Sequence, residues 1–109
     1  MAEATNNLAI HPHKINSLVS YQEGSVVSRE IIKTPKTTLT AFAFDKGQGL
    51  SEHTTPFTAL VQIIDGEANI YINRKEYVVK EGELIVMPEN IPHSLQAKKQ
   101  FKMLLTMIK

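Results

Sequence analysis

Short apolar runs alternate with turn-forming residues along most of the chain. After Gly24, the runs are rich in Val, Ile, Thr and Phe, and the residues between them are mostly Gly, Pro, Asn and Asp. This pattern is typical of strands joined by turns. The predicted strands cover residues 25–32, 37–44, 59–64, 67–72, 76–79, 83–87 and 101–108, with a shorter strand near 50–54. Many short strands predict an all-β chain, folded as a sandwich or a small barrel.

The dipeptide Asp65-Gly66 is a strong turn signal. It lies between two apolar runs, and a two-residue type I′ turn needs positive φ angles, which Asp tolerates and Gly adopts freely. The sequence therefore predicts a β-hairpin here, with separate strands before and after it. Residues 73–75 and 80–82 are predicted to form two further turns.

The N-terminal residues have a different pattern. Residues 1–13 show no periodicity and are predicted to form a flexible arm before a barrel domain over residues 14–109. His11 and His13 lie in this arm, where they either chelate a metal or belong to a solvated tail.

One short helix is predicted after the arm. Ile15, Leu18 and Val19 have helical spacing within residues 15–22, and Gly24 follows as a stop signal. A helix of this length is stable only when it packs on another element. We therefore expect it to lie against the outside of a sheet.

Two of the predicted strands, 59–64 and 101–108, are apolar on both faces. Because a half-exposed strand is apolar on one face only, strands of this kind must be covered on both sides. One face fills the interior, and the other needs the helix or a second subunit. We therefore expect a homodimer.

Composition narrows the class of protein further. The chain has 109 residues, which is enough for one domain. Its 12 basic and 11 acidic residues give a formal charge of +1, so binding to nucleic acid or to a membrane surface is not expected. With 0 Cys, any metal must be held by His, carboxylate, amide or water. Neither a leader pattern nor a membrane-spanning run is evident, so we expect a cytoplasmic protein.

The spacing of residues 47–66 resembles a known motif. Gly47 is followed after five residues by His53, then by Thr55, Ala59 and finally Gly66. This spacing is similar to the first motif of the cupin family, in which a glycine, a His-x-His pair, a glutamate and a final glycine stand at these intervals.

A second motif follows after a short spacer. From Gly82 the chain runs through Pro88, Asn90 and His93 to Ala97, and this is similar to the second cupin motif. The two segments together identify the chain as similar to small single-domain cupins over residues 37–108. The resemblance implies a compact β-barrel or jelly roll, commonly a homodimer, with a pocket inside the barrel.

In the family, three His and one Glu hold a divalent metal in that pocket. His53 matches the first of these His and His93 the last, but Thr55 and Ala59 stand at the positions of the second His and the Glu. The resemblance therefore implies a degenerate ligand set. His53 and His93 are the candidate metal residues, for weak binding of Zn, Mn, Fe or Ni, and they are expected to face one shared cavity. Without that role, His93 would close a turn with Pro92, with its imidazole bonded to a backbone carbonyl, and His53 would be a partly exposed histidine at a strand edge.

Three functions follow from the sequence. The first is a non-enzymatic cupin that binds a small molecule, or weakly a divalent metal, in the barrel pocket. The second is a metal-dependent enzyme of the dioxygenase or isomerase kind, with no catalytic residue assigned. The third is a structural interaction module that uses its outer apolar strands. The missing carboxylate favours the first.

Overall fold

The computed structural model describes residues 5–6 and 8–109, and this part of the chain is almost entirely β-structure. One 3-10 helix, η1 (Ile15–Ser17), accompanies the strands. The strands are β1 (Thr5–Asn6), β2 (Val26–Lys33), β3 (Thr37–Phe44), β4 (Gly49–His53), β5 (Thr58–Ile72), β6 (Lys75–Lys80), β7 (Leu84–Met87), β8 (His93–Gln96) and β9 (Phe101–Ile108). The predicted all-β class is confirmed.

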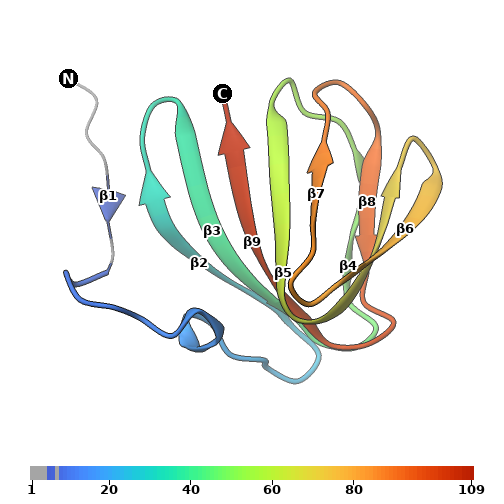
Figure 1. Cartoon of the computed structure of the whole chain (residues 1–109). Helices are drawn as coiled ribbons and strands as arrows, with labels where there is room; N and C mark the ends of the chain where they lie inside the picture. Colours follow the sequence, from blue (N-terminus) through green and yellow to red (C-terminus); the bar gives the residue numbers. More distant parts are fainter. Residues whose placement is uncertain (1–4, 7) are drawn as a thin grey trace.

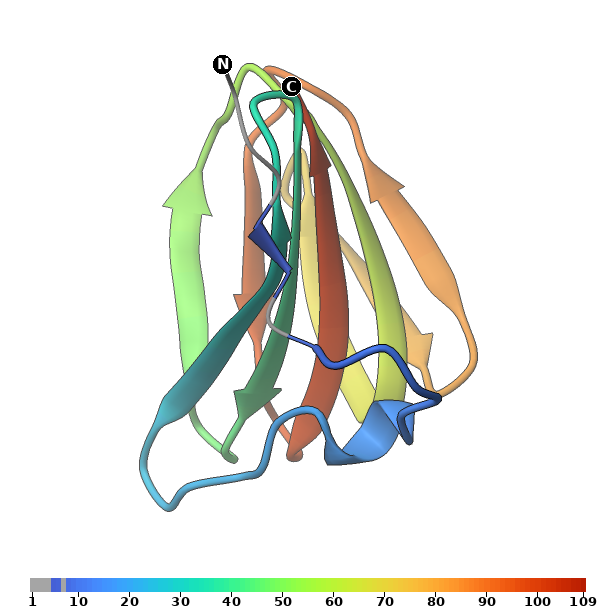
Figure 2. The ribbon, with the colours of Figure 1, turned by 90° about the vertical axis from the view of Figure 1, so that its left-hand side faces the viewer.

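The strands form one curled antiparallel sheet in the order β1-β2-β3-β9-β5-β8-β4, and β6 and β7 also pair with β5 (Figure 1). We call β2, β3, β9, β7 and the first half of β5 the front sheet. The rear sheet consists of β4, β8, β6 and the second half of β5. Seen from the side in Figure 2, β4 and β7 lie on opposite sides of the molecule. The result is a small barrel that the strands close only in part.

The predicted hairpin at Asp65-Gly66 is wrong, because residues 58–72 form the single strand β5. A β-bulge lies at this point, where Ile63 pairs with Met103 and Asp65 with Lys102, so that Ile64 is the extra residue. Gly66 has a φ of 71°, which matches the positive φ that the sequence suggested. The strand bends here instead of reversing, and it passes from the front sheet to the rear sheet.

The tight reversal lies at the end of β5. Asn73 and Arg74 have φ angles of 51° and 66° and connect β5 to β6, as a type I′ turn requires. The turn predicted at residues 73–75 is therefore present, and so is the turn before Glu83, where Gly82 has a φ of 85°.

Two apolar clusters lie on the two faces of the front sheet. The interior cluster includes the stacked rings of Phe44 and Phe101, whose centroids are 4.5 Å apart. The outer cluster is built on Ala41, Ala43 and Leu104. The strand β9 contributes to both clusters, so the expectation that it needs cover on both faces is confirmed.

The segment before β2 covers the outer cluster. Leu8, Leu18, Val19 and Tyr21 pack there, and Val19 is buried. The Tyr21 hydroxyl donates a hydrogen bond to Asp65 Oδ2 over 2.5 Å. The segment crosses in front of β9 in Figure 2.

The helix in this segment is shorter than the sequence predicts. It ends at Ser17, and Lys14 at its N-cap makes no side-chain capping bond. The structure describes residues 18–109 in full and has no helix there; Val19 and Tyr21 instead pack against the sheet in an irregular segment. Within the part predicted as an arm, Thr5 and Asn6 pair with Lys33 and Ile32 of β2, and residues 1–4 and 7 lie outside the described part of the chain.

Candidate functional site

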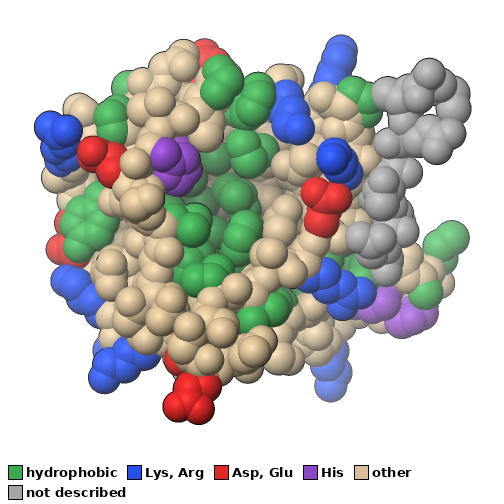
Figure 3. Space-filling model, turned by 180° about the vertical axis from the view of Figure 1, so that it is seen from behind, with side chains coloured by type: hydrophobic (Ala, Val, Ile, Leu, Met, Phe, Trp, Pro, Cys, Tyr) green, Lys and Arg blue, Asp and Glu red, His purple; other side chains and the backbone are tan. Residues whose placement is uncertain are grey.

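The inside of the barrel opens to the surface as a hollow lined by hydrophobic side chains, visible in Figure 3. The strand order leaves β2 and β4 unpaired with each other, so no hydrogen bonds between these strands close the barrel. Partly buried apolar side chains pack around the interior cluster, namely Val26, Phe42, Leu50, Ile72, Ile85, Leu105 and Met107. The hollow is therefore an apolar surface that solvent or a small molecule can reach.

His53 and His93 meet on the interior face of the rear sheet. His53 ends β4 and is the direct cross-strand partner of His93, the first residue of β8. His93 alternates with the buried core residue Leu95, which places its side chain on the interior face. The two Nε2 atoms are 3.1 Å apart, and the ring centroids are 4.3 Å apart at 68°. The sequence-based pairing of these histidines thus corresponds to a direct contact.

Each imidazole is oriented by a backbone carbonyl two residues earlier in the chain. His53 Nδ1 contacts the Ser51 carbonyl oxygen at 2.7 Å, and His93 Nδ1 contacts the Ile91 carbonyl oxygen at 3.2 Å. These local contacts turn both Nε2 atoms toward each other.

The two histidines differ in burial. His93 is 5% exposed, whereas His53 is exposed at the rim. Burial lowers the pKa of His93 below its ordinary value; the Ile91 carbonyl opposes this change, and the neighbouring charge of His53 adds to it.

A resident metal does not fit this donor set. Thr55, at the position of the second family histidine, donates its hydroxyl to the Phe57 carbonyl oxygen over 3.2 Å. Ala59, at the position of the glutamate, is buried and has no donor atom. Among the described residues, no group of at least three His, Cys, Asp or Glu side chains could hold a metal ion. Two imidazoles alone fall short of the three ligands of a catalytic zinc or of the facial triad that holds iron.

Two further residues could have supplied substitute ligands. Gln62 alternates with the interior residues Val61 and Ile63, so it lies on the outer face, and Glu89 is exposed in the loop before β8. Neither joins the histidines. The other pair, His11 and His13, is exposed in the N-terminal segment, where the rings stack at 4.1 Å.

Asn90 and Ala97, which stand where the cupin motif has a glycine and an asparagine, take part in backbone hydrogen bonds on either side of β8. Asn90 replaces a glycine but has a φ of 60°, a conformation that Asn adopts more readily than other side chains. Its N–H donates to the Thr55 carbonyl over 2.7 Å. At the other end of β8, Gly47 N–H donates to the Ala97 carbonyl over 2.7 Å. These bonds hold β8, and with it His93, against the segments that flank β4.

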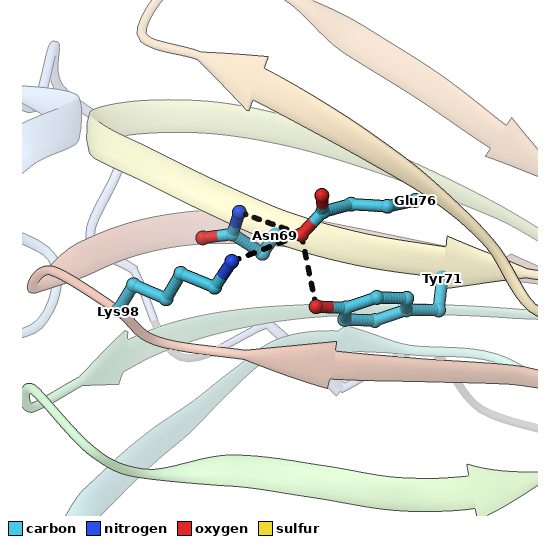
Figure 4. Close-up of polar contacts among 4 residues, drawn as sticks. All are labelled: Asn69, Tyr71, Glu76 and Lys98. Carbon is cyan, nitrogen blue, oxygen red and sulfur yellow. Dashed lines mark hydrogen bonds and ion pairs between the residues drawn. The ribbon is translucent and has the colours of Figure 1, made fainter.

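A polar cluster that the sequence did not suggest lies on the outer face of the rear sheet (Figure 4). Tyr71, Asn69 and Lys98 all donate to Glu76 Oε2, over 2.9, 3.2 and 3.2 Å. The hydrogen bond from Tyr71 is the largest cause that lowers the pKa of Glu76, and it also raises the pKa of Tyr71. Tyr71 and Glu76 are cross-strand partners, so a correctly placed β5–β6 hairpin would have revealed this pair. The cluster ties β5, β6 and the β8–β9 loop together.

A separate cavity of about 290 Å³ lies between η1 and the start of β7. Its lining includes Ile15, Gln62, Ile64 and Leu84. Because Gln62 and Ile64 are on the outer face of β5, this cavity is distinct from the hollow. In the described part of the chain, no helix is long and apolar enough to span a membrane.

Residues 39–108 match the family model of the AraC-like ligand-binding domain. No curated protein sequence matches the chain. Among solved structures, the chain is similar to a conserved protein of unknown function from Streptococcus pyogenes, with 35% identity and a TM-score of 0.91 over 100% of this chain and 96% of that one.

The chain is also similar to a cupin 2 conserved barrel domain protein from Leptotrichia buccalis, with 42% identity and a TM-score of 0.85 over 87% of this chain. The present chain therefore corresponds to 46% of the length of the Leptotrichia buccalis protein. A mutant of salicylate 1,2-dioxygenase from Pseudoaminobacter salicylatoxidans has a TM-score of 0.71 at 17% identity, over 76% of this chain and 26% of that one. At this identity the likeness shows the fold alone.

Proposed function

The chain belongs to the family of AraC-like ligand-binding domains, which are cupin-type barrels, and from this we propose that it binds a small, largely apolar molecule in the hollow of the barrel. Two observations carry the proposal: the apolar hollow in Figure 3, and the pair His53 and His93 on the interior face of the rear sheet. Small-molecule sites are typically concave and apolar, with a few polar groups that orient the ligand. The two imidazoles are suited to that orienting role.

The family model and the missing ligand side chains at Thr55 and Ala59 together favour binding over catalysis. In this reading the protein is a binding module, expected to act in the cytoplasm as a homodimer. The sequence-based alternative, a metal-dependent enzyme, would need a third ligand beside His53 and His93. Metal analysis of protein purified without chelator or a histidine tag tests that alternative. Stoichiometric Zn, Mn, Fe or Ni, lost when His93 is replaced, would support the enzyme.

An uncharged probe of the hollow tests the binding proposal. 4-Ethyltoluene is titrated into protein labelled with ¹³C at the methionine methyl groups, because Met87, Met103 and Met107 belong to or pack against the interior cluster. We expect these methyl signals to shift with saturation.

A matched pair of variants locates the binding. Val26→Phe enlarges a partly buried side chain that packs against the interior cluster, whereas Val78→Phe adds the same ring to the outer face of β6, where Val78 is 45% exposed. We expect Val26→Phe to weaken binding by about tenfold or more and Val78→Phe to leave it unchanged. Equal effects in both variants, or methionine methyl signals that do not shift as the probe is added, would contradict the proposal.

A further inference from the structure

The hydrogen bonds of the two imidazoles determine which group the His53–His93 pair can accept. Both Nδ1 atoms contact a backbone carbonyl oxygen, at 2.7 Å for His53 and 3.2 Å for His93. A carbonyl oxygen only accepts hydrogen bonds, so each Nδ1 carries a hydrogen and donates it. A neutral imidazole has one N–H group, and in the neutral pair each Nε2 therefore holds a lone pair.

These two lone pairs face each other. The Nε2 atoms are 3.1 Å apart, which is hydrogen-bond distance, but two acceptors attract each other only through a hydrogen shared between them. Neither neutral ring can supply this hydrogen from Nε2, because its single N–H group is at Nδ1 and is bonded to a backbone carbonyl. The neutral pair is therefore an acceptor of one hydrogen from another group.

The surroundings restrict what that group is. Leu50 and Ile72 pack around the hollow beside the two histidines, and Leu95 lies on the same face of β8 as His93. Among the described residues, no carboxylate completes a cluster with the two imidazoles. A proton held by the pair alone would leave a positive charge in an apolar site, where it needs an anion nearby. An acid supplies both the proton and the anion.

We propose that the molecule bound in the hollow carries one acidic O–H group, a carboxylic acid or a phenol on an apolar body, and that this group binds to the two Nε2 atoms. This inference rests on the proposed function, because the hollow must first admit a small molecule. A phenol brings its own hydrogen, whereas a carboxylic acid is ionised at neutral pH and binds as its anion together with one proton taken up from the solvent. Either the ligand oxygen keeps its hydrogen and donates it, or the hydrogen moves to Nε2 and leaves an oxyanion beside a cationic pair. The two arrangements contain the same atoms and the same total charge, and they differ only in the position of one hydrogen. The hydrogen bond between an acidic group and an imidazole is stronger than one between two ordinary neutral groups.

Probes of one shape test the inference. 4-Ethylphenol and 4-ethylbenzoate are compared at neutral pH with 4-ethyltoluene, which has a methyl group in place of the acidic group, and with 4-ethylbenzyl alcohol, whose hydroxyl is not acidic. We expect the phenol and the acid to bind about tenfold or more tightly than the other two probes, the effect of one charge-assisted hydrogen bond.

The preference should depend on the pair. His53 is exposed at the rim, so His53→Leu removes one Nε2 without opening a cavity in the core. We expect this variant to lose the preference, so that the phenol and the acid bind to it no more tightly than 4-ethyltoluene does. His13→Leu, a change at an exposed histidine in the N-terminal segment, is the control and should keep the preference.

The outcomes separate the inference from the proposed function. If all four probes bind equally well, or the alcohol binds as tightly as the phenol, the inference is overturned and the apolar binding site stands. Stoichiometric metal held by the pair would also overturn the inference, because the cation would occupy both lone pairs. If no probe binds, the proposed function itself fails.

Discussion

Backbone carbonyls two residues before His53 and His93 control the chemistry of both imidazoles. Each Nδ1 is committed to a carbonyl of its own strand or turn, so the orientation of each ring is a local property of the chain. The meeting of the rings is a long-range property, because it requires β4 and β8 to pair in the observed register. The motif spacing predicted that the two residues share a cavity, since it fixes their places in the barrel. The turn at Pro92-His93 predicted a backbone carbonyl partner for His93, and the Ile91 carbonyl is that partner. Nothing in the sequence predicted the carbonyl contact of His53, which depends on the local conformation of residues 51–53.

Acid should destabilise the protein through His93. Burial lowers its pKa, so between the folded and the unfolded pKa the folded state binds fewer protons than the unfolded state. The free energy of unfolding therefore falls as the pH drops below about 6.5, the ordinary pKa of histidine, and levels off below the folded pKa.

The melting temperature measured by circular dichroism between about pH 8 and pH 5 tests this sign. His93→Asn keeps a side-chain N–H near Nδ1 but does not titrate in this range. We expect its melting temperature to fall less on acidification than that of the unchanged protein. Parallel curves for the two proteins would show that His93 is not responsible.

At the scale of the elements, the local sequence pattern agrees with the observed strand pairing for most strands, and the two conflict at β5. The strands predicted at residues 37–44 and 101–108 have the predicted bounds, because their alternating apolar positions face the two clusters. At Asp65-Gly66 the local turn signal was correct about the backbone angle and wrong about the topology. Continuous pairing with β9 on both sides of Asp65 keeps the chain extended. The apolar pattern did not predict β8, because its residues His93–Gln96 include only one aliphatic side chain.

Replacing Gly66, at the bend in β5, should destabilise the protein more than replacing Gly82, which lies in a turn. A Cβ atom at Gly66 would lie 2.1 Å from the Gln100 carbonyl oxygen, which belongs to the backbone and cannot rotate away. Gly82 has a similar φ, 85° against 71°, but a Cβ atom there would meet nothing within 4 Å. The two positions therefore separate steric overlap from backbone strain.

Urea unfolding of the two alanine variants measures the difference. We expect Gly82→Ala to lose about 1 kcal/mol of stability from its positive φ alone. Gly66→Ala should lose about 3 kcal/mol or more, or fail to fold, because the clash adds to the strain. Equal losses in the two variants would mean that β5 shifts easily at the bulge.

At the scale of the whole molecule, the front sheet has a covered outer region and an open one. The N-terminal segment packs over β2, β3 and Leu104. Beyond it, Leu84 and Val86 of β7 and Ile108 of β9 point outward and are 58%, 49% and 54% exposed. Leu60 of β5, the cross-strand partner of Val86, lies between these strands on the same face. We call these four residues the apolar strip.

The apolar strip should be the contact between two copies of the chain. It carries no charge, and its strand β7 pairs only with β5 among the described residues, so a two-fold axis beside β7 would bring two identical strips together. Such an isologous contact closes on itself and leaves no strip exposed. In such a dimer, the second copy would be the cover that the sequence predicts for strands with two apolar faces.

Light scattering at micromolar concentration decides the matter. We expect a mass of about 24 kDa, twice the 12.2 kDa of one chain. Val86→Lys places a charge in the strip and should shift the protein toward the monomer, since burying an unpaired ammonium is strongly unfavourable. Val78→Lys makes the same change at a residue of similar exposure, 45% against 49%, on the outer face of the rear sheet, and should leave the mass unchanged. A 12 kDa particle for the unchanged protein, or equal dissociation in both variants, would show that the strip is not the contact.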